Sequence, residues 1–451
     1  MMKIDEPGLT CCEPAPHAAG AGVHAHALDR APGVGQERPR RLLLCLDGVP
    51  LELMRAAQGR GLFAGFNEPS ALISPFPTMT NIALATMLNA SAPLGYETVY
   101  FDREAREVRG GVHKYVGRRT PDKMPSSYMD ELDYQEPLPF EFLVYVAPDA
   151  VWRADMRRFR ERFRAAPRDR DYFAFLKGTD GLLHIRGPER LRPALESLDA
   201  ILRELRAWCG QETELVMFSD HGMSMGEVRK VHLRTHLERA GYELRPVLRG
   251  AGPRSVALPA FGLIGFAAIF CAAETDPAEV AATVAPLEGV DFAMYRDGAD
   301  AIVVRGAGGA ARVRRATDGG ARVRFSYEPL DGDPLALGET LRVMRDAGEL
   351  DADGFAANDV WLARTGGHDY PDALANLYDA MHSPRVHHVA DVLVSCRDGY
   401  YYGWTAFSRF IRLKATHGNA ARHSTHAFIM STHRRFGPYV RGTEARPVLR
   451  G

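Results

Sequence analysis

Short apolar runs and longer amphipathic segments alternate along the chain. Residues 42–46, 172–176 and 216–219 are almost entirely apolar or small, which is typical of strands covered on both faces of a parallel sheet. Between the second and third run, leucines recur in steps of four and three from Leu191 to Leu205, which predicts a helix with one face in the core. A strand, a helix and a further strand make a βαβ crossover, so this pattern predicts an α/β protein.

Further apolar runs of strand length lie at residues 142–146, 388–395 and 427–431. We predict that the last two return to the main sheet. Residues 151–166 place Met156, Phe159 and Phe163 on one side and many arginines on the other, which predicts an amphipathic helix.

The pattern of predicted strands and helices changes between residues 241 and 384. Segments at 265–271, 277–284, 290–295 and 301–305 predict strand, helix, strand and strand, and the Gly- and Arg-rich residues 306–321 are typical of turns. We predict that residues 241–384 form an inserted α+β subdomain and that residues 40–240 and 385–451 form the core. Residues 1–39 are rich in Ala, Gly, Pro and His without periodicity, which predicts a disordered tail.

Composition narrows the class of protein without naming a function. The chain has 451 residues, 25% charged and 46% hydrophobic, with a formal net charge of -1, so we expect neither a nucleic-acid polymer nor a membrane as partner. The six cysteines form no C-x-x-C pair, which favours a reducing compartment. Because neither an apolar run of membrane-spanning length nor a secretory signal is visible, we expect a cytoplasmic location. Oligomeric state is not defined by the sequence.

Polar residues with metal-binding or nucleophilic chemistry cluster at the predicted strand ends. Taken alone, each is more commonly part of a turn or a helix cap. Together, carboxylates, imidazoles and one hydroxyl are the inventory for two adjacent divalent metals with a nucleophile between them. The set comprises Asp47, Thr80, Asp180, His184, Asp220, His221 and His417.

The order of these motifs resembles the alkaline phosphatase superfamily, and within it the nucleotide pyrophosphatase/phosphodiesterase-like branch. The resemblance covers roughly residues 41–240 and 385–436. It implies a three-layer α/β sandwich with a mostly parallel central sheet. The motifs that carry it are Asp47-Gly, Phe-Pro-Thr-Met-Thr80-Asn, Asp180-x-x-x-His184, Asp220-His221-Gly and Thr-His417-Gly.

The resemblance also implies roles for these residues. Asp47, Asp220 and His221 would hold one ion, which also contacts the nucleophile Thr80, and Asp180, His184 and His417 would hold the second. Zinc is the expected metal, with manganese as the alternative. A covalent phosphothreonine would form on Thr80 and then be hydrolysed.

Two assignments leave alternatives open. Thr78 competes with Thr80 as the nucleophile, and the family places its nucleophile at the second threonine. The asparagine that the family usually offers to the phosphoryl oxygen has no clear counterpart. Asn81 is a candidate for this catalytic contact, although an asparagine at a helix start is equally expected as a cap.

The expected function is therefore a two-metal hydrolase of small-molecule phosphate esters, of the phosphodiester or nucleotide pyrophosphate type. A phosphomonoesterase or a phosphonate hydrolase with the same metal site is the enzymatic alternative. The alternative from a different class is a non-catalytic binding protein that keeps the alkaline phosphatase-like fold.

Overall fold

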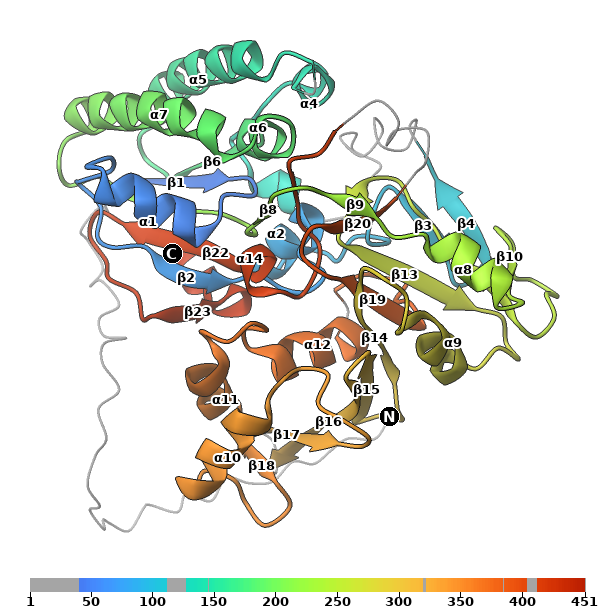
Figure 1. Cartoon of the computed structure of the whole chain (residues 1–451). Helices are drawn as coiled ribbons and strands as arrows, with labels where there is room; N and C mark the ends of the chain where they lie inside the picture. Colours follow the sequence, from blue (N-terminus) through green and yellow to red (C-terminus); the bar gives the residue numbers. More distant parts are fainter. Residues whose placement is uncertain are drawn as a thin grey trace, which may run out of the picture. The chain divides into compact units, whose positions relative to one another are not determined.

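The computed structural model describes residues 40–111, 127–144, 146–318, 322–383, 385–403 and 412–450. Residues from Pro39 onward form one compact unit. The tail predicted at residues 1–39 lies outside the described residues. The structure confirms the predicted α/β class, because within the described ranges mixed sheets alternate with helices (Figure 1).

The sheet that carries the predicted core strands is mixed. In the part of the chain that the structure describes, it has seven strands in the order β23-β2-β22-β7-β1-β6-β5. The neighbours of β1, which are β6 and β7, both run parallel to it, as the βαβ pattern predicts. The strands are β1 (Arg41–Leu46), β2 (Ser70–Ile73), β5 (Tyr134–Gln135), β6 (Tyr172–Leu176), β7 (Glu214–Phe218), β22 (His426–Ser431) and β23 (Tyr439–Arg441).

Alternating residues of β1 enter two different apolar clusters, one on each face of the sheet. Leu42, Leu44 and Leu46 pack with residues of α1, α5 and α7, whereas Leu43 and Cys45 pack with residues of α2 and α15. Helices therefore contribute to the core on both faces of this sheet. They are α1 (Leu51–Gly59), α2 (Thr80–Leu88), α5 (Pro148–Ala165), α7 (Pro188–Cys209) and α15 (Arg446–Arg450).

A second sheet holds most of the strands between residues 243 and 396. Within the described residues it has nine strands in the order β10-β11-β13-β19-β14-β15-β16-β17-β18. They are β10 (Glu243–Leu244), β11 (Ser255–Ala257), β13 (Phe266–Cys271), β14 (Val290–Arg296), β15 (Ala301–Gly306), β16 (Gly309–Asp318), β17 (Arg322–Pro329), β18 (Phe355–Ala357) and β19 (Val392–Cys396). Helices α8 (Leu233–Arg239), α9 (Pro277–Val284), α10 (Gly338–Asp346), α11 (Asn358–Thr365) and α12 (Ala373–His382) accompany it.

Three predictions about individual segments are wrong. The strand predicted at 388–395 forms as β19 but pairs with β13 and β14, so it belongs to the second sheet and not to the main one. The turns predicted at 306–321 are largely strand β16, because this segment pairs with β15 on one side and β17 on the other and buries Ala310, Ala311 and Val313. In the predicted strand 142–146, residues 142 and 143 form the end of helix α4 (Leu138–Leu143), residues 144 and 146 lie in turns, and residue 145 is outside the described residues.

Several shorter elements lie outside these two sheets or connect their strands. They are β3 (Val99–Asp102), β4 (Glu107–Gly110), β8 (Ser224–Met225), β9 (Arg229–Lys230), β12 (Leu263–Ile264), β20 (Tyr400–Gly403), β21 (Ala415–Thr416), α6 (Gly178–Arg186) and α14 (Arg422–Thr425). Among the described residues, we find no helix that combines the length and the apolar character needed to span a bilayer.

A buried carboxyl group on helix α5, that of Asp155, gives a pH dependence of stability that is separate from any catalytic chemistry. Burial, followed by the negative charge of Glu136, raises the pKa of Asp155 to about 7, although the Tyr134 hydroxyl donates to this carboxylate. Its contribution to stability is fully present below the unfolded pKa near 4 and is lost as pH rises through about 7, a swing of at most about 4 kcal/mol.

We therefore expect Asp155→Asn to raise the free energy of unfolding in urea at pH 8 and to change it little at pH 4.5. Urea titrations of both proteins across this range measure the difference. A difference that does not grow between pH 5 and 8 would contradict the assignment.

Candidate functional site

Most of the predicted site residues meet at one edge of the main sheet. Asp47 directly follows β1, and Asp220 and His221 follow Ser219 at the end of β7. Asp180 and His184 lie four residues apart on helix α6, which follows β6, so both face the same side of that helix. Because β1, β6 and β7 are parallel, their carboxyl ends share this edge.

The loops after β1 and β7 are tied together by hydrogen bonds. Gly48 has a φ of +69°, and its N–H donates to Asp220 Oδ1 at 3.1 Å. The Ser219 hydroxyl donates to the carbonyl of Val49 at 2.6 Å. A side chain at Gly48 would be strained at this φ and would lie within 3.3 Å of the His221 ring. The glycine after Asp47 therefore lets the two acidic loops approach closely.

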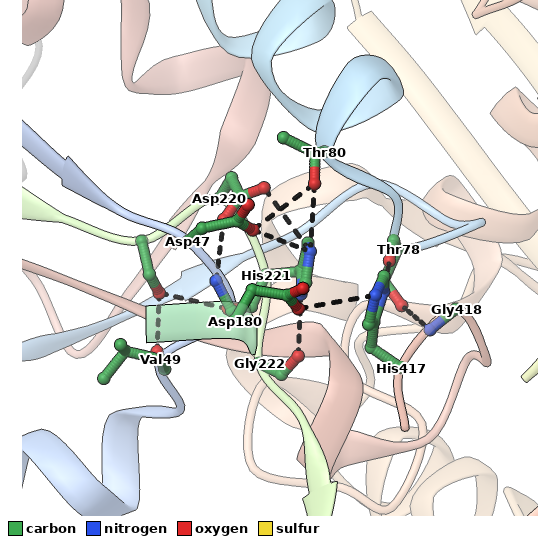
Figure 2. Close-up of polar contacts among 12 residues, drawn as sticks. Asp47, Val49, Thr78, Thr80, Asp180, Asp220, His221, Gly222, His417 and Gly418 are labelled. Carbon is green, nitrogen blue, oxygen red and sulfur yellow. Dashed lines mark hydrogen bonds and ion pairs between the residues drawn. The ribbon is translucent and has the colours of Figure 1, made fainter. Parts of the chain in front are cut away.

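Thr80 is the first residue of helix α2 and reaches the same edge from β2. Strand β2 is antiparallel to β22, which is antiparallel to β7, so β2 runs in the direction of β7. The Thr80 hydroxyl lies 3.3 Å from Asp47 Oδ1 and 3.4 Å from His221 Nε2, as Figure 2 shows. The hydroxyl is thus held between two members of the predicted ligand set.

Thr78 makes different contacts. Its side chain is fully buried, and its hydroxyl donates to the carbonyl of Asn419 at 3.1 Å and accepts the N–H of Gly418 at 2.9 Å. The carbonyl of Thr78 lies 2.8 Å from His417 Nδ1. Thr78 therefore supports the loop that carries His417, and its hydroxyl already has partners away from the carboxylates.

Each of the three predicted histidines is oriented by a backbone carbonyl. The carbonyls of Ala415, Gly222 and Thr78 lie 2.8 Å from Nδ1 of His184, His221 and His417, respectively. A carbonyl can only accept, so we assign the proton to Nδ1 in all three rings, which leaves the Nε2 lone pair free to bind a metal. These carbonyl partners could not be predicted from sequence, because no motif marks a backbone acceptor.

The Nε2 atoms face carboxylate oxygens. His184 Nε2 lies 3.2 Å and His417 Nε2 3.7 Å from Asp180 Oδ1. His221 Nε2 lies 3.4 Å from both Asp47 Oδ1 and Asp220 Oδ2. With Nδ1 protonated, these contacts bring lone pairs together, an arrangement that a cation between them would stabilise.

Unpartnered oxygens provide a separate test of whether a cation fits. Asp47 Oδ2, Asp180 Oδ1 and Asp220 Oδ2 are buried and accept no hydrogen bond. Buried carboxylates are normally paired or bind metals, so these oxygens fit a cation.

Two groups of residues have ligand atoms that all lie within 4.8 Å of one another, and both groups contain His221. They are Asp47, Asp220 and His221, and Asp180, His221 and His417. The first matches a predicted set. The second group differs from the predicted set Asp180, His184 and His417, because it contains His221 in place of His184. The His221 ring stacks on the His417 ring, with centroids 4.0 Å apart.

The electrostatics of the three carboxyl groups reflect their mutual proximity. Burial, and then the charges of Asp220 and Asp180, raise the pKa of Asp47 well above its usual value. Burial also raises the pKa of Asp220 to about 6, against the effect of the Gly48 N–H. Burial raises the pKa of Asp180 as well, but the neighbouring His184 and His417 bring it below its usual range. The site thus concentrates negative charge that needs compensation.

Two of the imidazoles stay neutral at neutral pH, which is the form that binds metals. Burial lowers the pKa of His221 to about 4, and burial with the charge of His221 lowers that of His417 to about 3. Burial also lowers the pKa of His184, but the Asp180 carboxylate more than compensates and raises it above its usual value.

Asn81 does not face the carboxylates. Its amide donates to the carbonyls of Tyr96 at 3.2 Å and Gly95 at 3.4 Å. These contacts tie the start of helix α2 to the segment at residues 95–97.

Fold and site together define a class of protein. It is an α/β protein in which two adjoining clusters of carboxylate and imidazole side chains, and a threonine hydroxyl, lie at the carboxyl edge of the main sheet. The sequence model of the type I phosphodiesterase / nucleotide pyrophosphatase family matches residues 94–304. The chain is therefore related to this family of the alkaline phosphatase superfamily, which confirms the resemblance predicted from the motifs. The match includes Asp180, His184, Asp220 and His221, and its family description supports an enzyme that hydrolyses phosphoesters.

Similar solved structures are distant in sequence. Phosphonoacetate hydrolase from Sinorhizobium meliloti 1021 in complex with phosphonoformate has a TM-score of 0.49 and 13% identity, covering 92% of this chain and 95% of that one. Murine ectonucleotide pyrophosphatase/phosphodiesterase 5 has a TM-score of 0.46 and 11% identity, with 91% and 94% covered. No curated protein matches the sequence.

Proposed function

We propose that this protein is a two-metal hydrolase of phosphodiesters or nucleotide pyrophosphates that acts through a covalent phosphothreonine on Thr80. The observation that carries this function is the position of the Thr80 hydroxyl, within 3.4 Å of both Asp47 and His221, beside three buried carboxylates that each have an unpartnered oxygen. The family match supports the phosphoester chemistry independently.

Two divalent cations, with zinc the first choice, would be held by six residues. Asp47, Asp220 and His221 are proposed for the ion nearest Thr80, and Asp180, His184 and His417 for the second. The mixture of imidazole and carboxylate ligands suits zinc, with manganese as the alternative. When bound, such cations lower the pKa of a coordinated hydroxyl and stabilise negative charge on phosphoryl oxygens.

The reaction would proceed in two displacements at phosphorus. The Thr80 oxygen forms a bond to phosphorus while the bond to the leaving oxygen breaks, and the hydroxyl proton is released to water, because Asp47 and His221, which face the hydroxyl, are proposed to bind the cation beside it. Water then attacks the phosphothreonine, and the Thr80 oxygen leaves with a proton. Buried surroundings strengthen the interactions between these groups and the transferred phosphoryl group.

The start of helix α2 is suited to hold phosphoryl oxygens, because the first N–H groups of a helix have no intrahelical acceptor and lie at its positive end. The proposed contact of the Asn81 side chain with the phosphoryl group would require it to leave the carbonyls of Gly95 and Tyr96. We therefore favour backbone N–H groups beside Thr80 as the phosphoryl donors.

We propose a three-layer sandwich core with residues 241–384 as an insert that shapes access to the site, and a small-molecule phosphate ester as substrate. A reducing, cytoplasmic compartment is supported by Cys45, Cys209, Cys271 and Cys396, which are free thiols in the described part of the chain.

A substrate panel tests this function. Purified protein loaded with zinc or manganese should hydrolyse bis-p-nitrophenyl phosphate faster than p-nitrophenyl phosphate, and chelation should abolish turnover. Faster turnover of the monoester would favour a phosphomonoesterase, and release of phosphate from phosphonoacetate would favour a phosphonate hydrolase. Metal binding without turnover of any of these compounds would favour a binding protein.

A further inference from the structure

A series of hydrogen bonds connects Thr80 to a segment that is distant in sequence. Asn81, the residue after Thr80, donates its amide to the carbonyls of Gly95 and Tyr96. The next residue, Glu97, accepts two backbone N–H groups with its carboxylate, from Gly262 at 2.5 Å and from Phe261 at 3.2 Å. Residues 95–97 therefore link the start of helix α2 to the segment at residues 261–265.

The same segment contacts the loop of His417. The N–H of Gly265 donates to the carbonyl of His417 at 2.6 Å, and the Thr416 hydroxyl donates to the carbonyl of Leu263 at 3.4 Å. The His417 ring returns to the nucleophile segment through Nδ1, which lies 2.8 Å from the carbonyl of Thr78, two residues before Thr80. The contacts therefore close a ring that passes through Thr80, residues 95–97, residues 261–265 and His417, and we call it the latch ring.

We propose that Glu97 is a positioning residue that closes the latch ring and so fixes His417 relative to the Thr80 hydroxyl. This role rests on the proposed function, because it concerns the alignment of the nucleophile with a proposed metal ligand. Glu97 touches neither the carboxylates nor Thr80, and it acts through the backbone of residues 261–265.

The two N–H groups that close the latch ring suit a carboxylate as their acceptor. One carboxylate can accept two N–H groups with separate oxygens, whereas an amide can accept with only one oxygen and would turn its NH₂ toward the second donor. Burial raises the pKa of Glu97 to about 7, and the N–H groups of Gly262 and Phe261 act against this rise. At mildly alkaline pH the carboxylate is therefore charged, and charged acceptors make the stronger hydrogen bonds.

The neighbouring residues leave little room for another arrangement. A side chain at Gly262 would place its Cβ 2.9 Å from Glu97 Oε1. At Gly95 the added Cβ would lie 2.3 Å from the Cβ of Tyr100. Glycine at position 262 lets the two segments approach closely enough for the carboxylate to reach both N–H groups, and glycine at position 95 lets Tyr100 pack against its own segment.

The variants Glu97→Gln and Glu97→Ala test this role at pH 8 with bis-p-nitrophenyl phosphate. Asp333→Ala is the matched control, because the Asp333 carboxylate likewise accepts two backbone N–H groups, from Leu337 at 3.0 Å and Gly338 at 2.7 Å, outside the latch ring. We expect kcat to fall roughly tenfold in Glu97→Gln and roughly a hundredfold in Glu97→Ala, with KM changed less than about threefold, because displacement by about 1 Å can cost this much. Asp333→Ala should lower the melting temperature and leave kcat unchanged.

Hydrogen exchange of the Gly265 amide provides a readout that does not depend on turnover. Gly265 does not contact Glu97, so faster exchange there in Glu97→Ala, but not in Asp333→Ala, would show that the carboxylate holds the segment that contacts His417. Unchanged Gly265 exchange, or a loss of kcat that merely parallels the loss of melting temperature across all three variants, overturns the role. If the wild-type protein hydrolyses no phosphoester, the proposed function fails, and exchange at Gly265 still decides whether the latch ring is held by Glu97.

Discussion

Replacing Thr80 by alanine is expected to lower kcat for bis-p-nitrophenyl phosphate by at least roughly a thousandfold, because removal of a nucleophile leaves only the contribution of binding and charge stabilisation. The Thr80 hydroxyl faces Asp47 and His221 but is the sole support of neither, since Gly48 and Ser219 also hold these loops. The variant should therefore fold and keep most of its metal capacity. Steady-state kinetics and metal analysis of the same preparation measure both quantities.

Two other variants at this threonine pair serve as controls. Thr80→Ser keeps a hydroxyl and should retain more activity than Thr80→Ala. Thr78→Val loses the hydrogen bonds to Gly418 and Asn419, so it should unfold at a lower temperature and lose less activity than Thr80→Ala. Activity that survives in Thr80→Ala and disappears in Thr78→Val would move the nucleophile to Thr78.

Asp47→Asn is expected to stabilise the metal-free protein while abolishing the binding of the ion proposed to lie nearest Thr80. Asp47 is fully buried, its Oδ2 accepts no hydrogen bond, and its pKa is raised by burial and by the charges of Asp220 and Asp180. A neutral amide of the same shape removes this unfavourable charge, and we expect a gain in the free energy of unfolding of roughly 1–3 kcal/mol at pH 8. Thermal unfolding in the presence of a chelator measures the gain, and zinc titration should show the loss of about one ion.

Asp199→Asn is the matched control for this effect. Asp199 is also a buried carboxylate, but its Oδ1 accepts the N–H of Phe63 at 2.9 Å and its Oδ2 pairs with Arg203 at 3.1 Å. A carboxylate with partners of this kind is stabilising, so Asp199→Asn should lower the stability of the metal-free protein and leave zinc binding unchanged. Destabilisation of the metal-free protein by Asp47→Asn would indicate that its carboxylate is compensated in solution without a metal.

Secondary structure could be predicted correctly where burial of an element produces a simple pattern of apolar residues in the sequence. Strands β1, β6 and β7 have apolar side chains on both faces, so their type and parallel pairing could be inferred from residues 42–46, 172–176 and 216–219. The prediction was wrong at residues 306–321, where arginines lie on strand β16 and make ion pairs such as that of Arg312 with Asp297. Composition alone cannot distinguish such a polar strand from a turn, because strand pairing supplies the missing stabilisation.

Which sheet a strand joins also depends on pairing partners that are distant in sequence. Residues 392–396 are as apolar as the main-sheet strands, yet they pair with β13 and β14. Their apolar pattern satisfies either sheet, and the choice depends on which neighbours the connecting segments bring close.

By itself the sequence determined the α/β class, the parallel core strands and the kinds of side chain at their ends, because periodicity and the chemistry of Asp, His and Thr are local properties. Only the tertiary structure decided that Thr80 and not Thr78 faces the carboxylates, that three backbone carbonyls orient the three histidines, and that Glu97 joins two distant segments. These features depend on backbone groups that every residue possesses. Their positions are set by the packing of the whole chain, so no sequence motif marks them.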